Sequence, residues 1–175
     1  VVEALQAAAE GDTDYSSVAV AAVDESGAEL EMYVFPPMHE RGLSVKGNRD
    51  FGVRAVDSIT EGYDVELTDM VVEANKAPGV AQRLRDETDL PARPVDSTDD
   101  KEARIHDFGG AVESAEVQFV GDSDGEVWRD WEVNEWLQFP NAGHIDRTDA
   151  MSILYRELDS GDDAWSGSDV GLGGL

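Results

Sequence analysis

The chain has 175 residues, enough for one domain, and its 41% hydrophobic content can form a core, which argues against a disordered protein. The chain contains 39 Asp and Glu but only 13 Lys and Arg, which gives a net charge of −26. The lack of cysteine excludes disulfides and thiolate metal sites. No apolar run reaches membrane-spanning length and no signal peptide is visible, so we expect a halophilic globular protein that is absent from the membrane and whose self-repulsion is screened by salt.

Apolar periodicity and turn residues predict alternating strands and helices along the chain. Strands are expected at 1–6, 16–23, 29–35, 65–74, 92–95 and 117–120. Helices are expected at 50–60, 79–88, from a Ser97 or Thr98 cap through Phe108, at 126–137 and at 146–158. Residues 38–49 are expected to form a loop. This order predicts an α/β domain with a mixed β-sheet flanked by helices.

The folded domain is expected to cover residues 1–158. From Asp159 the chain is rich in Gly, Ser and Asp, which predicts a flexible acidic tail over 159–175. A tail that docks on another protein is the alternative interpretation. The chain starts with Val1-Val2 and has no initial Met, so we expect it to be a piece of a longer protein.

Glu73 stands out among the acids because of its place at the end of an apolar run. The run Asp69-Met70-Val71-Val72-Glu73 is typical of a buried strand, and a Gly/Pro turn and a helix follow it. The carboxyl ends of buried strands in α/β folds are where ligand and metal sites form. Glu73 is therefore predicted to be a functional carboxylate.

A second pair of acids occurs where the last helix is expected to begin, in His144-Ile145-Asp146-Arg147-Thr148-Asp149. Asp146 and Asp149 are three residues apart and so share a helix face. Acids at a helix N-terminus are also favoured by about 0.3–1 kcal/mol through the helix dipole, so helix electrostatics alone is the alternative explanation. His144 adjoins this pair and is a candidate for positioning water or phosphate.

Basic residues gather in one stretch of this acidic chain. They are candidate contacts to the phosphates of DNA, with a solvated loop as the alternative, and they are Arg41, Lys46, Arg49 and Arg54. Lys101 and Arg104 form a second candidate DNA-binding pair, able to neutralise charge on a phosphate or to orient an acid; a solvated helix face is the alternative. The four tryptophans are expected to pack in the core.

Four segments, taken in order, resemble a known family. They are Gly11-Asp12-Thr13-Asp14-Tyr15-Ser16, Val71-Val72-Glu73-Ala74-Asn75, Lys101-Glu102-Ala103-Arg104-Ile105, and Phe139-Pro140 followed by His144-x-Asp146-x-x-Asp149-Ala150. Together they resemble the C-terminal nuclease domain of the large terminase subunit of tailed viruses, over residues 1–158. The resemblance implies a ribonuclease H-like fold and a metal-dependent endonuclease that cuts concatemeric viral DNA during packaging. The acidic composition adds the expectation of a haloarchaeal virus or provirus, and thus of the host cytoplasm.

The resemblance also implies a metal site. In this family three acidic positions hold two divalent ions, Mg²⁺ or Mn²⁺; the second position matches Glu73 and the third Asp146, with Asp149 as an outer ligand. Two such ions about 3.5–4 Å apart can hold an attacking water and a leaving 3′ oxygen in line on a phosphodiester. All three residues are therefore expected to serve catalysis and metal binding.

The first acidic position of the family falls on Gln6, where the family has Asp. Either the carboxylate has been replaced, or the register differs and Asp12 or Asp14 supplies the ligand. Because an amide brings no negative charge to balance a cation, weak metal binding and poor cleavage are expected of this chain.

The family further implies double-stranded DNA as substrate, with an upstream ATPase domain of the same polypeptide, the portal protein and the small terminase subunit as partners. The chain has no Walker-type loop, so the ATPase would precede it. Two alternatives stay open: another ribonuclease H-like nuclease such as a resolvase, and a non-catalytic assembly or DNA-translocation module. The charge of −26 predicts that the isolated domain binds DNA poorly.

Overall fold

A computed structural model of the protein describes residues 2–6, 15–24, 31–73, 79–97, 100–121 and 125–160. Within these ranges seven strands form one mixed sheet in the order β6-β5-β1-β2-β3-β7, with β4 paired to β2 outside this path. The strands are β1 (Val2–Gln6), β2 (Tyr15–Asp24), β3 (Glu31–Val34), β4 (Met38–Arg41), β5 (Asp69–Glu73), β6 (Ala92–Val95) and β7 (Val117–Phe119). The helices are α1 (Val45–Tyr63), α2 (Val80–Glu87), α3 (Lys101–Glu113), α4 (Glu126–Trp131), the π-helical turn η1 (Glu132–Trp136) and α5 (Asp146–Asp159).

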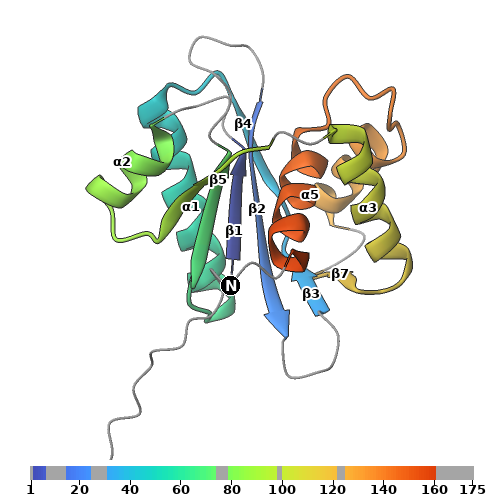
Figure 1. The fold of residues 1–175 in the computed structure, drawn as a ribbon, viewed down its shortest axis with the longest axis horizontal. Coiled ribbons are helices and arrows are strands. Elements are labelled where there is room, and N and C mark those ends of the chain that lie inside the picture. Colours follow the sequence, from blue (N-terminus) through green and yellow to red (C-terminus); the bar gives the residue numbers. More distant parts are fainter. Residues whose placement is uncertain are drawn as a thin grey trace, which may run out of the picture.

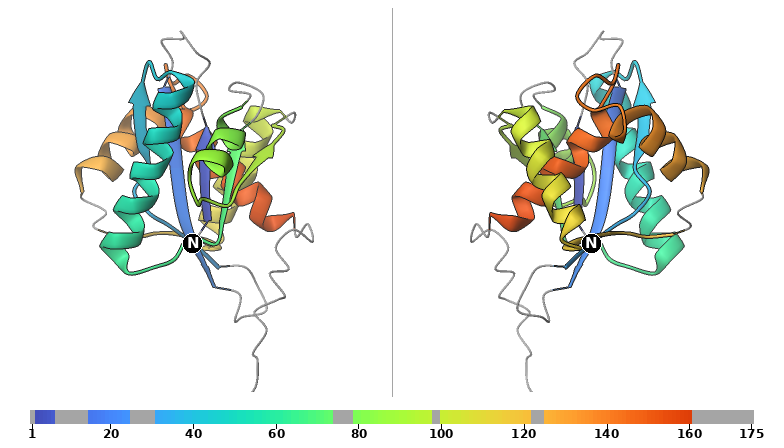
Figure 2. Two further views of the ribbon diagram at one scale, coloured as in Figure 1. Left: turned by 90° about the vertical axis from the view of Figure 1, so that its left-hand side faces the viewer. Right: turned by 90° about the vertical axis from the view of Figure 1, so that its right-hand side faces the viewer.

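The centre of the sheet combines antiparallel and parallel pairing. β2 runs antiparallel to β1, β3 and β4, whereas β5 runs parallel to both β1 and β6. Figures 1 and 2 show α1 and α2 on one face of the sheet and α3 and α5 on the other. The predicted mixed sheet flanked by helices is therefore confirmed.

Alternation along β2 divides the core into two clusters. Val18 and Val20 pack in the cluster that includes α1 and α2, while Ala19 and Ala21 pack in the cluster that includes α3 and α5. The small alanine side chains allow α5 to lie directly on β2 and β1. This packing brings the first turn of α5 close to the central strands.

Most element boundaries agree with the sequence-based prediction, and the largest differences lie between residues 38 and 50. β4 forms where a loop was predicted, because its pairing with β2 does not need an apolar face; most of its side chains are exposed. α1 begins earlier than predicted, since the Ser44 hydroxyl caps it by accepting a hydrogen bond from the Gly47 N–H at 3.1 Å. The cap of α3 is Asp100, which accepts from the Glu102 N–H, rather than Ser97 or Thr98.

The tryptophans belong to the core as far as the structure describes them. Trp128 and Trp131 are buried in the α5-side cluster, and Trp136 packs against it, as expected of core residues, while Trp165 lies outside the described residues. Among the described residues no helix is long and apolar enough to cross a membrane. Residues 161–175 of the predicted tail lie outside the described ranges.

Candidate active site

Glu73 is a buried carboxylate at the carboxyl end of a central strand. The residue is only 5% exposed, whereas most of the described acids are not buried. Val71, two residues earlier on β5, packs in the α5-side cluster, and strand alternation gives Glu73 the same face. The predicted position of Glu73 at the end of a buried strand is thus present, and it faces the helix layer that contains α5.

Gln6 lies at the same end of the neighbouring strand. β1 pairs parallel to β5 with Leu5 beside Val72, and Gln6 and Glu73 are the next residues of their strands. On its other side β1 pairs Gln6 with Ser17 of β2. The alternative ligands Asp12 and Asp14 lie outside the described residues.

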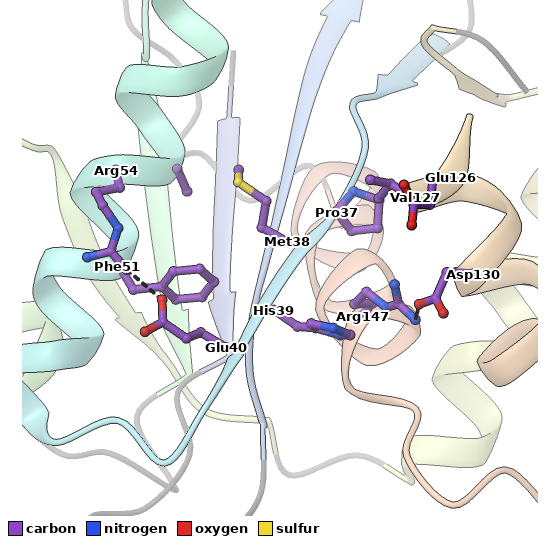
Figure 3. Close-up of a pocket in the computed structure, with 11 residues that line it drawn as sticks. Pro37, Met38, His39, Glu40, Phe51, Arg54, Glu126, Val127, Asp130 and Arg147 are labelled. Carbon is purple, nitrogen blue, oxygen red and sulfur yellow. Dashed lines mark hydrogen bonds and ion pairs between the residues drawn. The ribbon is translucent and has the colours of Figure 1, made fainter.

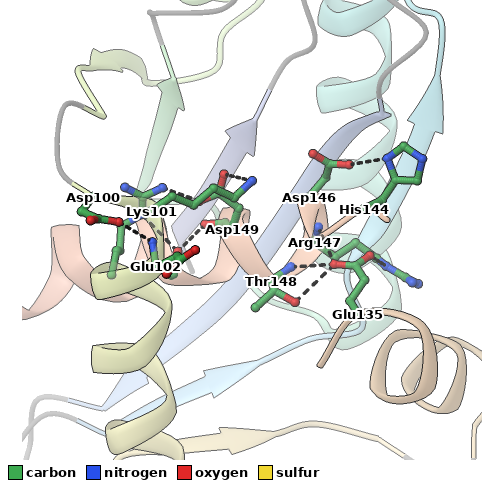
Figure 4. A network of polar contacts seen from close by, with 11 residues as sticks. Asp100, Lys101, Glu102, Glu135, His144, Asp146, Arg147, Thr148 and Asp149 are labelled. Carbon is green, nitrogen blue, oxygen red and sulfur yellow. Dashed lines mark hydrogen bonds and ion pairs between the residues drawn. The ribbon is translucent and has the colours of Figure 1, made fainter. Parts of the chain in front are cut away.

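Asp146 is the first residue of α5, and its side chain is 14% exposed. In Figure 1 β1 and β5 run upward while α5 runs from its orange first turn down to its red end, so the start of α5 lies at the carboxyl ends of both strands. The Nδ1 atom of His144 lies 3.7 Å from Oδ2 of Asp146 (Figure 4). The fold therefore brings the strand end of Glu73, the strand end of Gln6 and the helix start of Asp146 to one edge of the sheet.

Asp149 is buried one helical turn further along α5 and holds two cations from α3. One carboxylate oxygen accepts a hydrogen bond from the Arg104 guanidinium, and the other lies 2.9 Å from Nζ of Lys101 (Figure 4). Arg104 is also buried, and its Nε donates to the Ser152 hydroxyl at 3.1 Å. Of the two roles predicted for Lys101 and Arg104, orienting an acid is the one that this geometry supports.

A buried acid that the sequence did not single out holds the start of α5. Glu135, 3% exposed on η1, accepts hydrogen bonds from the backbone N–H groups of Arg147 and Thr148 at 3.0 and 3.1 Å and from Nε of Arg147 at 2.6 Å. The residue that precedes α5, Ile145, supplies no side-chain capping bond, and Glu135 caps this helix from another element. The only sequence signal for it was its place inside a predicted amphipathic helix.

The basic residues between 41 and 54 do not form one patch. Arg49 pairs with Asp50 and Glu87, and Arg54 pairs with Glu40 at 2.6 Å. Lys46 is exposed on the first turn of α1.

Arg41 lies apart from that group, at the end of β4. Its guanidinium carbon is 4.7 Å from the centre of the Tyr15 ring, and its Nη2 is 3.4 Å from Nε2 of His144. Arg41 is thus the one member of the predicted basic stretch whose described contacts reach the neighbourhood of Asp146.

The described residues do not offer a complete set of metal ligands. Within the ranges that the structure covers, no group of three or more His, Asp or Glu side chains could hold a metal ion. Asp149 is engaged by Lys101 and Arg104, and the strand position beside Glu73 carries the neutral residue Gln6. Among the described residues, this edge of the sheet therefore has carboxylates at two of the three predicted ligand positions, Glu73 and Asp146, with Gln6 at the remaining one.

Comparison of the sequence with protein-family models and with curated proteins gave no match. The fold is similar to solved structures of viral terminases. The nuclease domain of the human cytomegalovirus terminase, soaked with Mn, aligns over 89% of this chain and 82% of its own, with a TM-score of 0.56 and 11% identity. The large terminase nuclease of thermophilic phage G20c with bound zinc aligns over 89% and 81%, with a TM-score of 0.53 and 16% identity.

The large terminase of bacteriophage HK97 aligns over 86% of this chain but only 37% of its own length, with a TM-score of 0.54 and 13% identity. The chain thus has the fold of terminase nuclease domains. This confirms the ribonuclease H-like α/β fold that the sequence resemblance implied.

Proposed function

We propose that this chain is the nuclease domain of a viral DNA-packaging terminase whose metal site lacks one carboxylate. The observation that carries the proposal is Glu73, buried at the end of β5 on the face that α5 covers, with Asp146 opening α5 at the same edge of the sheet. Buried acids placed together at the ends of central strands are typical of functional sites. The similar nuclease structures, soaked with Mn or containing zinc, support divalent-metal chemistry.

Glu73 and Asp146 are the proposed metal ligands, with Mg²⁺ or Mn²⁺ as the cation because these ions prefer carboxylate oxygen. Asp149 is proposed as an outer ligand whose carboxylate is held in position by Lys101 and Arg104. Gln6 supplies no charge at the first of the three ligand positions, so two carboxylates would have to balance the metal charge that three carboxylates balance in the family. We therefore infer weak metal binding and slow cleavage of concatemeric DNA by this chain.

A second candidate function is a non-catalytic module of the packaging motor, and Gln6 is the observation that favours it. In this alternative the fold serves assembly or DNA translocation and the metal chemistry is lost. In either case the proposed partners are double-stranded DNA, an ATPase domain upstream in the same polypeptide, the portal protein and the small terminase subunit. The proposed setting is the cytoplasm of a haloarchaeal host.

The test compares the natural chain with the Gln6→Asp variant. Mn²⁺ binding is measured by isothermal titration calorimetry, and plasmid nicking is measured in Mn²⁺ at high salt. The third carboxylate is expected to tighten Mn²⁺ binding by about tenfold or more, on the order of 1.4 kcal/mol, and to produce nicking. Adding Glu73→Gln to Gln6→Asp should abolish both gains.

The matched control is Gln82→Asp, which introduces the same charge at an exposed position on α2. If Gln6→Asp binds Mn²⁺ no better than Gln82→Asp and does not nick DNA, the assignment of this site is wrong. If Gln6→Asp gains metal binding and nicking while the natural chain shows neither, the natural chain is the non-catalytic form.

A further inference from the structure

Two neighbouring cavities lie along β4 and share part of their lining, and together we call them the groove. Their volumes are about 450 and 350 Å³, and both are lined by His39, Asp130 and Arg147. Figure 3 shows His39 of β4 in the middle, with Arg54 of α1 on one side and Asp130 and Arg147 on the other. The groove thus crosses β4 from α1 toward the start of α5.

Aromatic and basic side chains gather around Tyr15, and three of them, Tyr15, His39 and His144, line the smaller cavity. The Tyr15 ring centre is 4.7 Å from that of His39 and 5.1 Å from that of His144, and the Arg41 guanidinium lies over it. The four residues come from β2, β4 and the segment before α5, so long-range packing assembles the cluster. His39, Arg41 and His144 are exposed.

The groove is also less acidic than the rest of the protein. The chain as a whole has three acids for every Lys or Arg, whereas the lining of the two cavities has two acids for every Arg, four against Arg54 and Arg147. Three of these acids already hold an arginine: Glu135 and Asp130 bind Arg147, and Glu40 binds Arg54. An anionic ligand would therefore meet less repulsion here than on the acidic surface.

We propose that a phosphodiester-binding site is formed by Tyr15, His39, Arg41 and His144. The site would bind one strand of duplex DNA along β4, so that this strand continues to Asp146. The proposal rests on the proposed function, because it takes DNA as the ligand. Guanidinium and imidazole N–H groups are donors to phosphate oxygens, and Tyr15 fixes their arrangement through ring contacts. His144 joins the cluster to the proposed active site, since it contacts Arg41 at 3.4 Å and lies 3.7 Å from Asp146.

This site is metal-independent, so its test is separate from the test of the nuclease assignment. Binding of a short fluorescein-labelled DNA duplex is measured by fluorescence anisotropy in EDTA, at the lowest salt in which circular dichroism shows the protein folded. The natural chain is expected to bind weakly, and Arg41→Ala should lower its affinity by about fivefold or more and reduce the slope of log K against log salt by about 1. His144→Ala should also weaken binding.

The matched control is Arg83→Ala, which removes an exposed arginine that pairs with Glu87 on α2. It should bind DNA as the natural chain does. The proposal is overturned if Arg41→Ala and His144→Ala both bind like Arg83→Ala, or if the natural chain does not bind at all. It is also overturned if inorganic phosphate, at the phosphate concentration of the duplex, displaces the DNA, because the site would then bind a free anion. Failure here leaves the Mn²⁺ response of Gln6→Asp unaffected, so the two proposals fail separately.

Discussion

Glu135 and Arg147 form a buried ion pair that joins η1 to the first turn of α5, with Nε of Arg147 2.6 Å from Oε1 of Glu135. The same carboxylate accepts the backbone N–H groups of Arg147 and Thr148, the two residues that follow Asp146. One side chain thus neutralises a buried cation and caps a helix. The orientation of the proposed metal ligand Asp146 depends on this contact between two elements.

Removing the Glu135 carboxylate should destabilise the domain strongly. Glu135→Ala leaves Arg147 buried beside unbonded N–H groups at the start of α5, and breaking a buried pair from one side costs about 3–5 kcal/mol. Glu135→Gln keeps an acceptor oxygen and should lose less. The measurement is urea unfolding at constant salt.

Asp130→Ala is the control for this prediction, because Asp130 binds the same arginine at 2.8 Å but its side chain is 47% exposed. An exposed pair contributes about 0–1 kcal/mol, so this variant should remain close to the natural chain. Equal losses for Glu135→Ala and Asp130→Ala would show that the burial of Glu135 does not matter.

The two cations that hold Asp149 should differ in their contribution to stability. Arg104→Ala removes a guanidinium that is 4% exposed and takes from the buried Asp149 the more deeply buried of its two described cations, so a loss of about 3 kcal/mol is expected. Lys101→Ala removes a side chain that is 35% exposed and should cost less than about 1 kcal/mol. Thermal unfolding of both variants at the same salt concentration tests the order, and an equal or reversed order would contradict it.

The sheet and the helices were predictable wherever the apolar pattern repeats within one segment. β5, β6 and α5 agree with their predicted ranges to within a few residues because each buries side chains at a regular spacing. β4 was not predictable in this way, since its residues are mostly exposed and only pairing with β2 extends them.

The candidate site likewise has residues that the sequence predicted and contacts that it could not predict. Glu73 was predicted from its own strand, and the family resemblance placed Asp146 at the start of the last helix. The partners of Asp149 and Arg147 are set by packing between elements: Arg104 lies 45 residues from Asp149, and Glu135 lies 12 residues from Arg147. No local pattern could indicate which of 39 acids these arginines would bind.

Replacing Asp64 with glycine should stabilise α1. Asp64 ends this helix in the left-handed conformation, with φ 53° and ψ 51°, where a Cβ atom is unfavourable. A glycine there should add about 0.5 kcal/mol, after its greater freedom in the unfolded chain is subtracted. Asp57→Gly is the control: it removes the same charge from an exposed site inside α1 and should destabilise by about 0.5 kcal/mol. Urea unfolding should give shifts of opposite sign, and shifts of the same sign would contradict this account of the cap.

His39 should make the domain less stable in mild acid. Although His39 is exposed at the surface, partial desolvation of its ring lowers its pKa below the ordinary value of 6.5, and the positive charge of Arg147 lowers the pKa further. Glu135 and Asp130 act in the opposite direction, and His144 adds a lowering effect. The unfolded chain therefore binds this proton more readily than the folded one. His39 has no effect on stability well above pH 6.5, and it lowers the stability of the fold as the pH falls from about 6.5 to the folded-state pKa, below which the penalty is constant.

His39→Gln removes this titration and should flatten the dependence of stability on pH between about pH 7 and pH 5 relative to the natural chain. Urea unfolding across that range measures the difference in stability between the two chains, and NMR titration of the imidazole C–H signals of His39 gives its pKa directly. The two chains should differ least at the upper end of the range and most at the lower end, because only the natural chain must charge a partly desolvated ring beside Arg147. An imidazole that titrates at or above 6.5, or parallel stability profiles for the two chains, would refute the prediction.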